Sequence, residues 1–467
     1  MVSFKTTRSV RIARAQFERP EIMPVTIGVR REDKNEWERR VPLVPTDVAQ
    51  LQAKYGLRFM VQSSPIRVYR DEEYLAAGIQ VGEDLSPAQL IVAIKEVPVP
   101  LLMPGKTYMY FAHVTKGQPH NMPMLRRLLE LGCSLVDYEK IVDEQNRRLI
   151  FFGRHAGYAG MVETLCGLGQ RLATMGLQTP FAQVKHAYAY PDLDSAKGHL
   201  SDLGKQILRV GLPPSLRPLV IGLSGYGNVS RGAQEVLDCL NVRQVAVSEL
   251  AAEADTKSEW GEIFKVIFRE EDLVRPADPD AAFDLQDYYK NPERYRGCFE
   301  AHLPYLDVLV NAIYWEERYP RLVTREWARR SYVPGAQPRL KVIGDISCDI
   351  EGSIELTVKA TTPDSPCYVY DPVTDAVHDG VSGNGPVIMA VDNLPCEFPR
   401  ESSQYFSAVM RDIVWGLAAA DWRTDFAELD LPSHIKKAVI VHKGELAPSY
   451  RYLEQFLEPV QQPVDRS

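Results

Sequence analysis

Three features are missing from this 467-residue sequence: closely paired cysteines, long apolar runs and an excess of basic over acidic residues. The seven cysteines are scattered without a C-x-x-C pair, which predicts reduced thiols in a cytosol-like compartment and no metal site of the zinc type. No apolar run approaches the roughly 20 residues that a membrane-spanning helix needs. The net charge of −8 leaves no broad basic surface, so we expect neither a nucleic-acid partner nor a membrane partner.

The N-terminal segment, residues 1–20, is basic and carries four Lys or Arg residues before its first acid, Glu18. It lacks the apolar stretch of a secretory signal peptide. Two interpretations stay open, a disordered tail and a mitochondrial transit peptide. We therefore predict a cytoplasmic protein, with the mitochondrial matrix as the alternative.

What the sequence does contain is the alternation of an α/β protein. Apolar runs such as "AQLIVAIKEVP" and "TYMYFAHV" read as buried strands, and amphipathic segments such as "MLRRLLELG" read as helices between them. A helix is expected to begin at Thr46, which would cap it. A long, glycine-containing helical segment, residues 153–177, follows the first set of strands and is interpreted as the bridge between domains.

The predicted fold is therefore α/β with two Rossmann-like, doubly wound domains, the first of them discontinuous. Residues 24–170 are assigned to the first segment of a substrate domain, and residues 195–374 to a dinucleotide-binding domain. Residues 375–460 are predicted to return to the substrate domain.

The stretch "VIGLSGYGNVSRGA", residues 220–233, predicts a dinucleotide-binding turn between a strand and a helix. Gly225 would permit the tight turn, and Gly227 would let the backbone approach a pyrophosphate. The N–H groups of Asn228, Val229 and Ser230, at the start of the helix, would face the anion. The small residues Ser230 and Gly232 suit close packing of the helix against the strand. An ordinary strand–turn–helix corner without a bound nucleotide could have the same sequence pattern.

The sequence favours NADPH over NADH as the cofactor. An acid about 20 residues after the turn would bind the ribose 2′-hydroxyl of NADH, but the end of the next strand along the chain falls near Ala246. The nearest acid is Glu249, and Arg231 lies just beyond the turn, where it could meet a 2′-phosphate.

Candidate catalytic residues end two of the buried strands in the first domain. Lys95 and His113 each follow an apolar run, and ligands of open α/β sheets bind at these carboxyl ends. Burial lowers the pKa of a lysine toward the range of an acid–base catalyst, and a histidine already titrates there. Arg30 and Arg40 suit carboxylate binding. Taken singly, these residues could equally be a solvent-reaching lysine, a core histidine and surface charges.

Several of these motifs, in this order, resemble the superfamily of alanine dehydrogenase, transhydrogenase and saccharopine dehydrogenase. They are "GVRREDKNEWERRVPLVP", "IKEVP", "FAHVTK", "VDYEKIVD", "FGRHAGYAGM", "NAIYWEERYPRLVTR" and "VDNLPCEFPRESS". Within it, the sequence resembles the lysine–ketoglutarate reductase portion of the bifunctional aminoadipate semialdehyde synthase over residues 24–455.

The resemblance implies roles for individual residues. Lys95 and His113 would be the acid–base pair, with Glu139 tuning their charges. The implied substrate contacts are Arg30, Arg40, Gln118, Arg148 and Phe152, and the implied cofactor contacts are Gly225, Gly227, Asn228, Val229, Ser230, Arg231, Arg147, Asp345, Ile346 and Ser347.

The resemblance also implies an activity, the NADPH-dependent condensation of L-lysine with 2-oxoglutarate to saccharopine. Its partners would be these small molecules, with a homo-oligomer possible and no metal required. Alternatives are the NAD-dependent, lysine-forming saccharopine dehydrogenase, a related amino-acid dehydrogenase using another amine, and a nucleotide-sensing protein without catalysis. The segment "DYYKNPERYRGCFEAHLPY" and the lack of an aspartate at Ala246 favour the reductase over the NAD-dependent enzyme.

Overall fold

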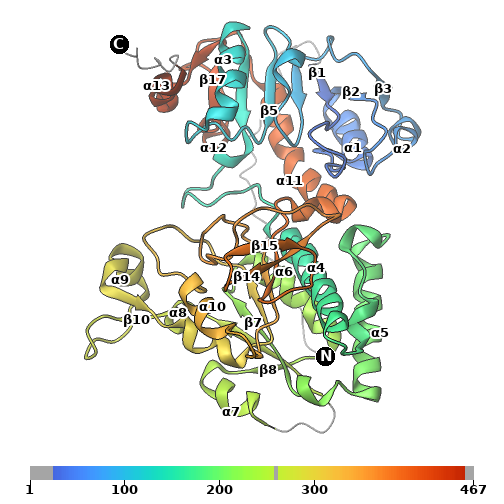
Figure 1. Ribbon diagram of the computed structural model, residues 1–467. Helices are drawn as coiled ribbons and strands as arrows, with labels where there is room; N and C mark the ends of the chain where they lie inside the picture. Colours follow the sequence, from blue (N-terminus) through green and yellow to red (C-terminus); the bar gives the residue numbers. More distant parts are fainter. Residues whose placement is uncertain (1–24, 257–260, 458–467) are drawn as a thin grey trace, which may run out of the picture.

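The computed structural model describes residues 25–256 and 261–457, and the basic segment 1–20 lies outside the described residues. These residues form two sheets of eight strands, drawn one above the other in Figure 1, with helices packed against them. The predicted α/β class with two doubly wound units is confirmed. In the described ranges, no helix combines the length and the apolarity that crossing a membrane requires.

The first sheet contains the strands that carry the predicted catalytic residues. Its spatial order is β18 (Glu445–Leu446), β17 (Val439–His442), β6 (Ser134–Asp137), β5 (Thr107–Tyr110), β4 (Leu90–Val92), β1 (Thr26–Val29), β2 (Arg58–Gln62) and β3 (Gln80–Gly82). The six strands from β6 to β3 are parallel, and β17 joins β6 in the antiparallel direction. The central strands are buried on both faces, which is why they read as continuous apolar runs.

The second sheet contains the glycine-rich turn. Its order is β15 (Ala376–Asp379), β14 (Cys367–Asp371), β16 (Val387–Met389), β13 (Val342–Asp345), β12 (Val308–Asn311), β7 (Leu219–Ser224), β9 (Ile263–Phe268) and β8 (Arg243–Val245). All neighbours are parallel except β14, which runs antiparallel to β15 and β16. A separate two-stranded ribbon pairs β10 (Val274–Pro276) with β11 (Tyr295–Gly297).

The helices divide between the first part of the chain, which holds the first sheet, and the second part, which holds the second sheet. The helices of the first part are α1 (Pro45–Tyr55), α2 (Asp71–Ala76), α3 (Met122–Glu130), α11 (Pro399–Ala419), α12 (Ser433–Lys436) and α13 (Glu454–Leu457). The helices of the second part are α4 (Gly153–Thr174), α5 (Leu193–Val210), α6 (Asn228–Leu237), α7 (Leu250–Ala254), α8 (Glu270–Leu273), α9 (Leu285–Lys290) and α10 (Arg325–Ser331). Helix α1 begins at Pro45 rather than at a Thr46 cap, because proline is well suited to the first helical position.

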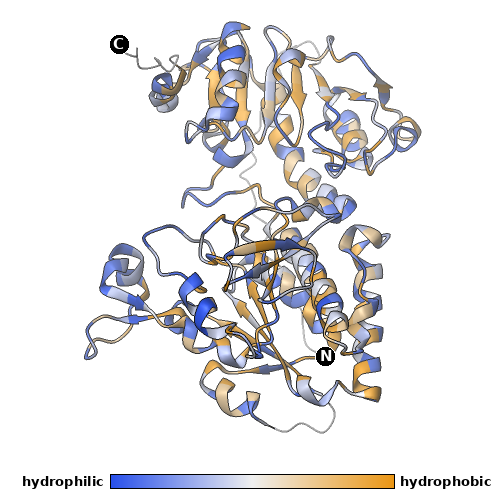
Figure 2. Ribbon diagram, in the orientation of Figure 1, coloured by the Kyte–Doolittle hydropathy of each residue, from blue (hydrophilic) through white to orange (hydrophobic). Residues whose placement is uncertain are grey.

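The chain crosses between the two parts twice, at the start of α4 and at the start of α11. Strands β15 and β16 still belong to the second sheet, so the predicted boundary at residue 375 falls inside that sheet. The apolar face of α11, with Phe406, Met410 and Leu417, packs into the core of the first part. The orange strands of both sheets in Figure 2 mark these separate interiors.

Helix α4 packs closely against α6, the helix that follows the glycine-rich turn. A Cβ at Gly157 would overlap the carbonyl oxygen of Val229, and a Cβ at Gly232 would overlap that of Arg154. Ser230 is fully buried at the same contact. The small residues therefore serve helix–helix packing, which fixes the turn relative to the bridge between the two parts.

Candidate active site

Four neighbouring parallel strands of the first sheet end at predicted site residues. Arg30 follows β1, Lys95 follows β4, His113 follows β5 and Glu139 follows β6, and these strands are adjacent in the order β6-β5-β4-β1. The carboxyl ends of parallel strands meet at one edge of a sheet, so the four residues share one edge. Lys95 and His113 lie close enough that the lysine charge lowers the histidine pKa.

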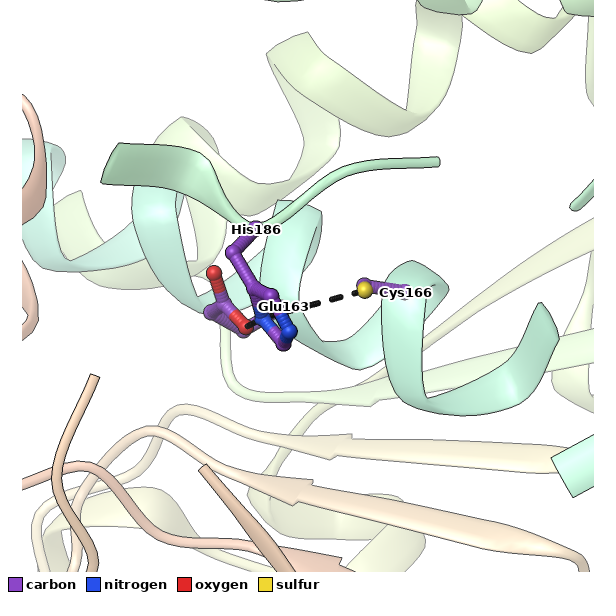
Figure 3. Close-up of side chains that lie close together, drawn as sticks. All are labelled: Glu163, Cys166 and His186. Atoms are coloured by element: carbon purple, nitrogen blue, oxygen red, sulfur yellow. Dashed lines mark hydrogen bonds and ion pairs between the residues drawn. The ribbon is translucent and has the colours of Figure 1, made fainter. Parts of the chain in front are cut away.

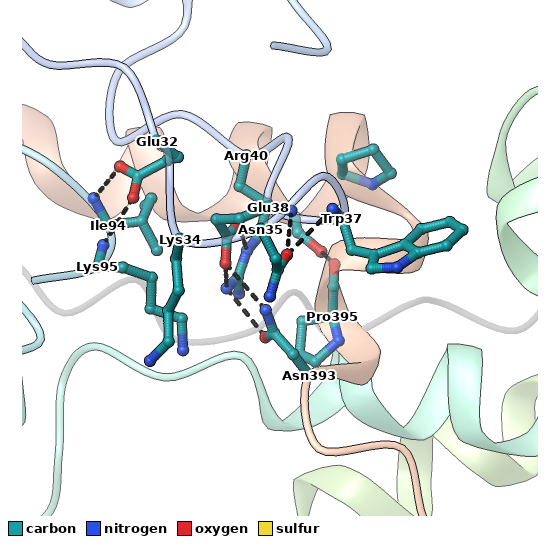
Figure 4. Close-up of polar contacts among 12 residues, drawn as sticks. Glu32, Lys34, Asn35, Trp37, Glu38, Arg40, Ile94, Lys95, Asn393 and Pro395 are labelled. Atoms are coloured by element: carbon teal, nitrogen blue, oxygen red, sulfur yellow. Dashed lines mark hydrogen bonds and ion pairs between the residues drawn. The ribbon is translucent and has the colours of Figure 1, made fainter. Parts of the chain in front are cut away.

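Lys95 is half-buried at this edge, and its backbone is fixed by a buried carboxylate (Figure 4). Glu32 accepts hydrogen bonds from the N–H groups of Ile94 and Lys95 at 2.6 and 3.0 Å. Burial lowers the pKa of Lys95, and the Arg40 guanidinium lowers it further. Burial, followed by the nearby Glu38 carboxylate, raises the pKa of Glu32 to about 8. The lysine is therefore displaced toward the neutral amine, as an acid–base catalyst requires.

His113 adopts a backbone conformation that is unusual for its residue type. Its φ of 48° lies in the left-handed region, a strain that folded proteins retain mainly at functional sites. The ring lies parallel to Phe111, and Nδ1 is 3.9 Å from Oε2 of Glu96. Burial lowers the pKa of His113, and the Glu139 carboxylate is the strongest influence that opposes it.

Replacing Glu139 by glutamine should lower the pKa of His113 further. The variant removes the negative charge that most favours the imidazolium, while burial and the Lys95 ammonium remain. Titration of the ring-carbon resonances in histidine-labelled protein would measure the shift. Glu144→Gln, on an exposed position of the same loop, is the matched control and should leave the His113 curve in place. An unchanged curve in Glu139→Gln would contradict the assignment.

Arg40 was predicted to bind a substrate carboxylate, but the structure gives its guanidinium an internal partner. Nε and Nη2 donate to the two oxygens of Glu38 at 2.7 and 2.6 Å, and Nη2 also donates to Oδ1 of Asn393 at 3.1 Å. The guanidinium carbon lies 4.3 Å from the centre of the Phe152 ring, which stacks on Phe406. The Glu38 carboxylate therefore occupies the guanidinium N–H groups of Arg40 that the sequence analysis had assigned to a substrate carboxylate.

The remaining predicted substrate residues differ in how far they reach this edge. Arg30 is buried and pairs with Asp33 at 2.5 Å. Arg148 pairs at 3.1 Å with Glu139, the carboxylate that acts on His113. Gln118 is half-buried, and its Oε1 accepts from the N–H of Lys116.

Arg147, predicted to reach the cofactor, is exposed, with a side chain 74% accessible. Its guanidinium pairs with Asp143 at 2.7 Å in the same turn. The structure therefore holds Arg147 against its own loop.

The glycine-rich turn has the shape that was predicted. Gly225 has a φ of +90°, and a Cβ there would come within 3.1 Å of Ile313 and of the Ala312 carbonyl oxygen. Gly227 precedes α6, which begins at Asn228, so the first N–H groups of the helix are open at the turn. A nicotinamide dinucleotide fits this cradle through its pyrophosphate. The side chain of Val229 lies against Gly153 of α4, and Ser230 is buried with its Oγ accepting from Gln234, so their backbone N–H groups are the ones that can serve an anion.

Asp345 lies fully buried at the end of β13 and ties three strand ends together. It accepts from Asn311, Ser347 and Thr357, and Asn311 also accepts a hydrogen bond from the hydroxyl of Ser224 on β7. Burial raises the pKa of Asp345. This network holds β7, β12 and β13 in register beside the turn. The side chain of Ile346 packs toward Gly160 on α4. Of the predicted residues 345–347, Asp345 and Ser347 are therefore the ones whose side chains belong to the polar network beside the turn.

The strand next to β7 in the sheet is not the next one along the chain, so the count to Ala246 follows a strand that does not neighbour the turn. Strand β8, which ends at Val245, is the edge strand, and β9 inserts between it and β7. The residues that follow the neighbouring strand are therefore Arg269 and Glu270. The Arg269 guanidinium lies 4.9 Å from the ring centre of Tyr226, inside the glycine-rich turn.

A pocket of about 370 Å3 opens at this place. It is lined by the turn, by Phe268 and Glu270 at the end of β9, and by aromatic residues that include Tyr289 and Trp315. Glu270 accepts a hydrogen bond from the Tyr289 hydroxyl at 2.6 Å. Tyr289 belongs to "DYYKNPERYRGCFEAHLPY" and Trp315 to "NAIYWEERYPRLVTR", two of the segments quoted from the sequence.

Comparison with known proteins agrees with this architecture. The N-terminal domain of the alanine dehydrogenase/PNT family matches residues 28–159, and the C-terminal domain of that family matches residues 254–449. Among solved structures, an L-alanine dehydrogenase superposes with a TM-score of 0.57 at 18% identity, covering 93% of this chain and all of that one. At this identity the likeness shows the fold.

Curated relatives are similar over nearly the whole chain. An α-aminoadipic semialdehyde synthase of Arabidopsis thaliana is 38% identical over 445 residues, which are 91% of this chain and 41% of that protein. The mitochondrial enzyme of that name from Bos taurus is 36% identical and is covered to 48%. A saccharopine dehydrogenase [NAD(+), L-lysine-forming] of Neurospora crassa is 26% identical over 82% of this chain and 89% of its own length.

The chain thus spans less than half the length of the semialdehyde synthases that it matches, and the resemblance seen in the sequence is confirmed over that part. The two matched domains and the common fold lead to one conclusion. The chain belongs to the alanine dehydrogenase/PNT family.

Proposed function

We propose that the chain catalyses the reductive condensation of L-lysine with 2-oxoglutarate to saccharopine, using NADPH, in lysine degradation. The observation that carries the proposal is the strand-end cluster of Lys95, His113 and Glu139. Relatives named as semialdehyde synthases and saccharopine dehydrogenases support the substrate class. We place the reaction in the cytosol, with the matrix as the alternative because a related enzyme is mitochondrial.

The chemistry needs two groups that both donate and accept protons. The ε-amine of lysine attacks the keto carbon of 2-oxoglutarate, two protons leave the nitrogen in turn, and the oxygen takes up two protons and departs as water, which leaves an imine. Burial lowers the pKa of both Lys95 and His113, which favours the neutral, proton-accepting form of each side chain. The bound cofactor would supply hydride to the resulting imine carbon. Arg148 and Arg30 are cations near this edge, and a substrate carboxylate would compete there with their present partners, Glu139 and Asp33.

We infer that Arg269, rather than Arg231, recognises the 2′-phosphate of NADPH. Arg269 follows the strand beside β7 and lies over Tyr226 of the turn. In the described ranges, no carboxylate pairs with its guanidinium, whereas the Glu270 carboxylate already accepts from Tyr289. Glu270 is nevertheless the acid that would bind a ribose hydroxyl of NADH, and this residue favours the NAD-dependent alternative.

Initial rates with lysine and 2-oxoglutarate test the reaction and the cofactor together. We expect NADPH to be oxidised faster than NADH at equal concentration, with ornithine and alanine as poorer amines. Saccharopine, identified by mass, should be the product. Oxidation of neither cofactor with any of these amines would contradict the proposed reaction, and a preference for NADH would favour the alternative.

Arg269→Ala should raise the KM for NADPH about 10- to 100-fold and leave the KM for NADH nearly unchanged, because a charge-assisted contact to phosphate contributes roughly 1.5–3 kcal/mol. Arg231→Ala is the matched control, since this exposed arginine lies in the first turn of α6. Fluorescence titration of each cofactor measures the same difference without turnover. A larger loss in Arg231→Ala than in Arg269→Ala would restore the assignment made from the sequence.

A further inference from the structure

A cluster of metal-ligating side chains lies on α4, outside the strand-end cluster (Figure 3). Glu163 and Cys166 are three residues apart, so they share one face of the helix, and His186 approaches them from the segment after α4. One ligand atom from each of the three residues lies within 4.8 Å of the others. The sequence had predicted no such set, because the three residues are separated by spacings that match no zinc motif.

The contacts within this cluster are short and mostly shielded from water. His186 Nδ1 is 2.8 Å from Oε2 of Glu163 and 3.8 Å from Sγ of Cys166. The other oxygen of Glu163 accepts from the N–H of Ala187 at 2.5 Å. The cluster therefore brings an imidazole nitrogen, a carboxylate oxygen and a thiol sulfur together where Glu163 and Cys166 are buried.

A second carboxylate faces the cluster without a hydrogen-bond partner. Glu397 is only 2% exposed, and among the described residues neither of its oxygens has a partner at hydrogen-bond distance. Its carboxyl group lies close enough to that of Glu163 and to Cys166 to interact with both residues. Two adjacent buried carboxyl groups are costly to ionise unless a proton or a cation lies between them.

We propose that Glu163, Cys166, His186 and Glu397 form a binding site for a divalent transition-metal cation of the zinc class. A thiolate, an imidazole and carboxylates are ligands that zinc accepts in four-coordinate sites. With tetrahedral bonds of usual length, neighbouring ligand atoms lie about 3.3–3.6 Å apart. The observed separations of 2.8 and 3.8 Å need changes of about half an ångström or less. His186, with 26% of its side chain exposed, provides the entry path.

The cluster also borders the first part of the chain. The His186 ring stacks on Tyr188 at 5.6 Å and 3°, and Tyr188 lies 4.9 Å from Trp37, which precedes the Glu38–Arg40 pair. Glu397 follows Asn393, the residue that hydrogen-bonds to both Glu38 and Arg40. A bound cation would therefore stabilise the contact between the two parts, independently of which reaction the strand-end cluster performs.

Cobalt chloride added to the metal-free full-length chain tests the site without any assay of activity. We expect one saturable site per chain with visible bands of four-coordinate cobalt and a near-ultraviolet thiolate-to-cobalt band. Cys166→Ser should abolish the near-ultraviolet band, and Glu397→Gln should weaken binding about tenfold or more. Cys239→Ser, on a half-buried cysteine whose thiol bonds only to the Glu235 carbonyl oxygen, is the matched control and should keep the band.

Zinc X-ray absorption on the wild-type protein provides a measurement that no folding defect of a variant can disturb. It should show one sulfur neighbour together with nitrogen and oxygen neighbours at ordinary zinc distances. A shell of oxygen and nitrogen alone, a cobalt band that survives Cys166→Ser, or the absence of saturable binding would each overturn the proposal.

Discussion

Lys95→Met should reduce kcat by about 10²–10⁴, the range that positioned acid–base groups contribute. Methionine has a similar length and lacks the titrating amine, so the packing of the chain after β4 should survive. Glu32 holds the backbone of this segment through the N–H groups of Ile94 and Lys95, and the side chain takes no part in those bonds. Substrate and cofactor should therefore still bind while proton transfer fails.

Rapid quench and steady-state rates with NADPH, lysine and 2-oxoglutarate would measure the loss, and cofactor binding would be measured by fluorescence. Lys106→Met is the matched control. Lys106 lies at the opposite end of β5, where its Nζ donates to the Ser86 carbonyl oxygen, so we expect nearly wild-type turnover. A merely structural role for Lys95 would lower the melting temperature and leave the pH profile unchanged. Normal turnover by Lys95→Met would remove the acid–base assignment.

The strand ends could be predicted from the sequence because two local patterns agree there. Lys95 and His113 each end a run of apolar residues, and buried parallel strands are the runs that read in this way. Gly225 and Gly227 were likewise predictable, since a strand, a tight turn and a helix must follow one another along the chain. Such features depend on neighbours in the sequence alone.

Strand order and buried charge pairs depend on contacts between distant segments, and there the sequence misled. The sequence does not show that β9 inserts between β7 and β8, so the count to Ala246 ended at the edge strand and not at the strand beside the turn. The run "KNEWERR" looks like a solvated loop, and only the fold shows that Glu38 and Arg40 are buried against Asn393. The Glu163–Cys166–His186 set was hidden for the same reason.

Glu38→Gln should lower the free energy of unfolding by about 3–5 kcal/mol, because it leaves the buried Arg40 guanidinium without its counter-charge. Both side chains are almost inaccessible, at 0% and 2% of their surface. The guanidinium lowers the pKa of Glu38 even though burial acts in the opposite direction, so the pair is ionised at neutral pH. The variant should also lower the pKa of Lys95 further, since Glu38 is the strongest of the charges that raise it.

Denaturant unfolding and the pH dependence of kcat/KM measure these two effects separately. Asp421→Asn breaks an exposed pair with Arg423 and should change neither. The double variant Glu38→Met with Arg40→Met should regain much of the stability, because an apolar pair of similar volume needs no counter-charge. The pKa of Lys95 should also move back toward its wild-type value, because the double variant removes the charge that lowers this pKa together with the one that raises it. Wild-type stability in Glu38→Gln would show that water reaches Arg40, and the guanidinium would then be free to take the substrate carboxylate that the sequence had assigned to it.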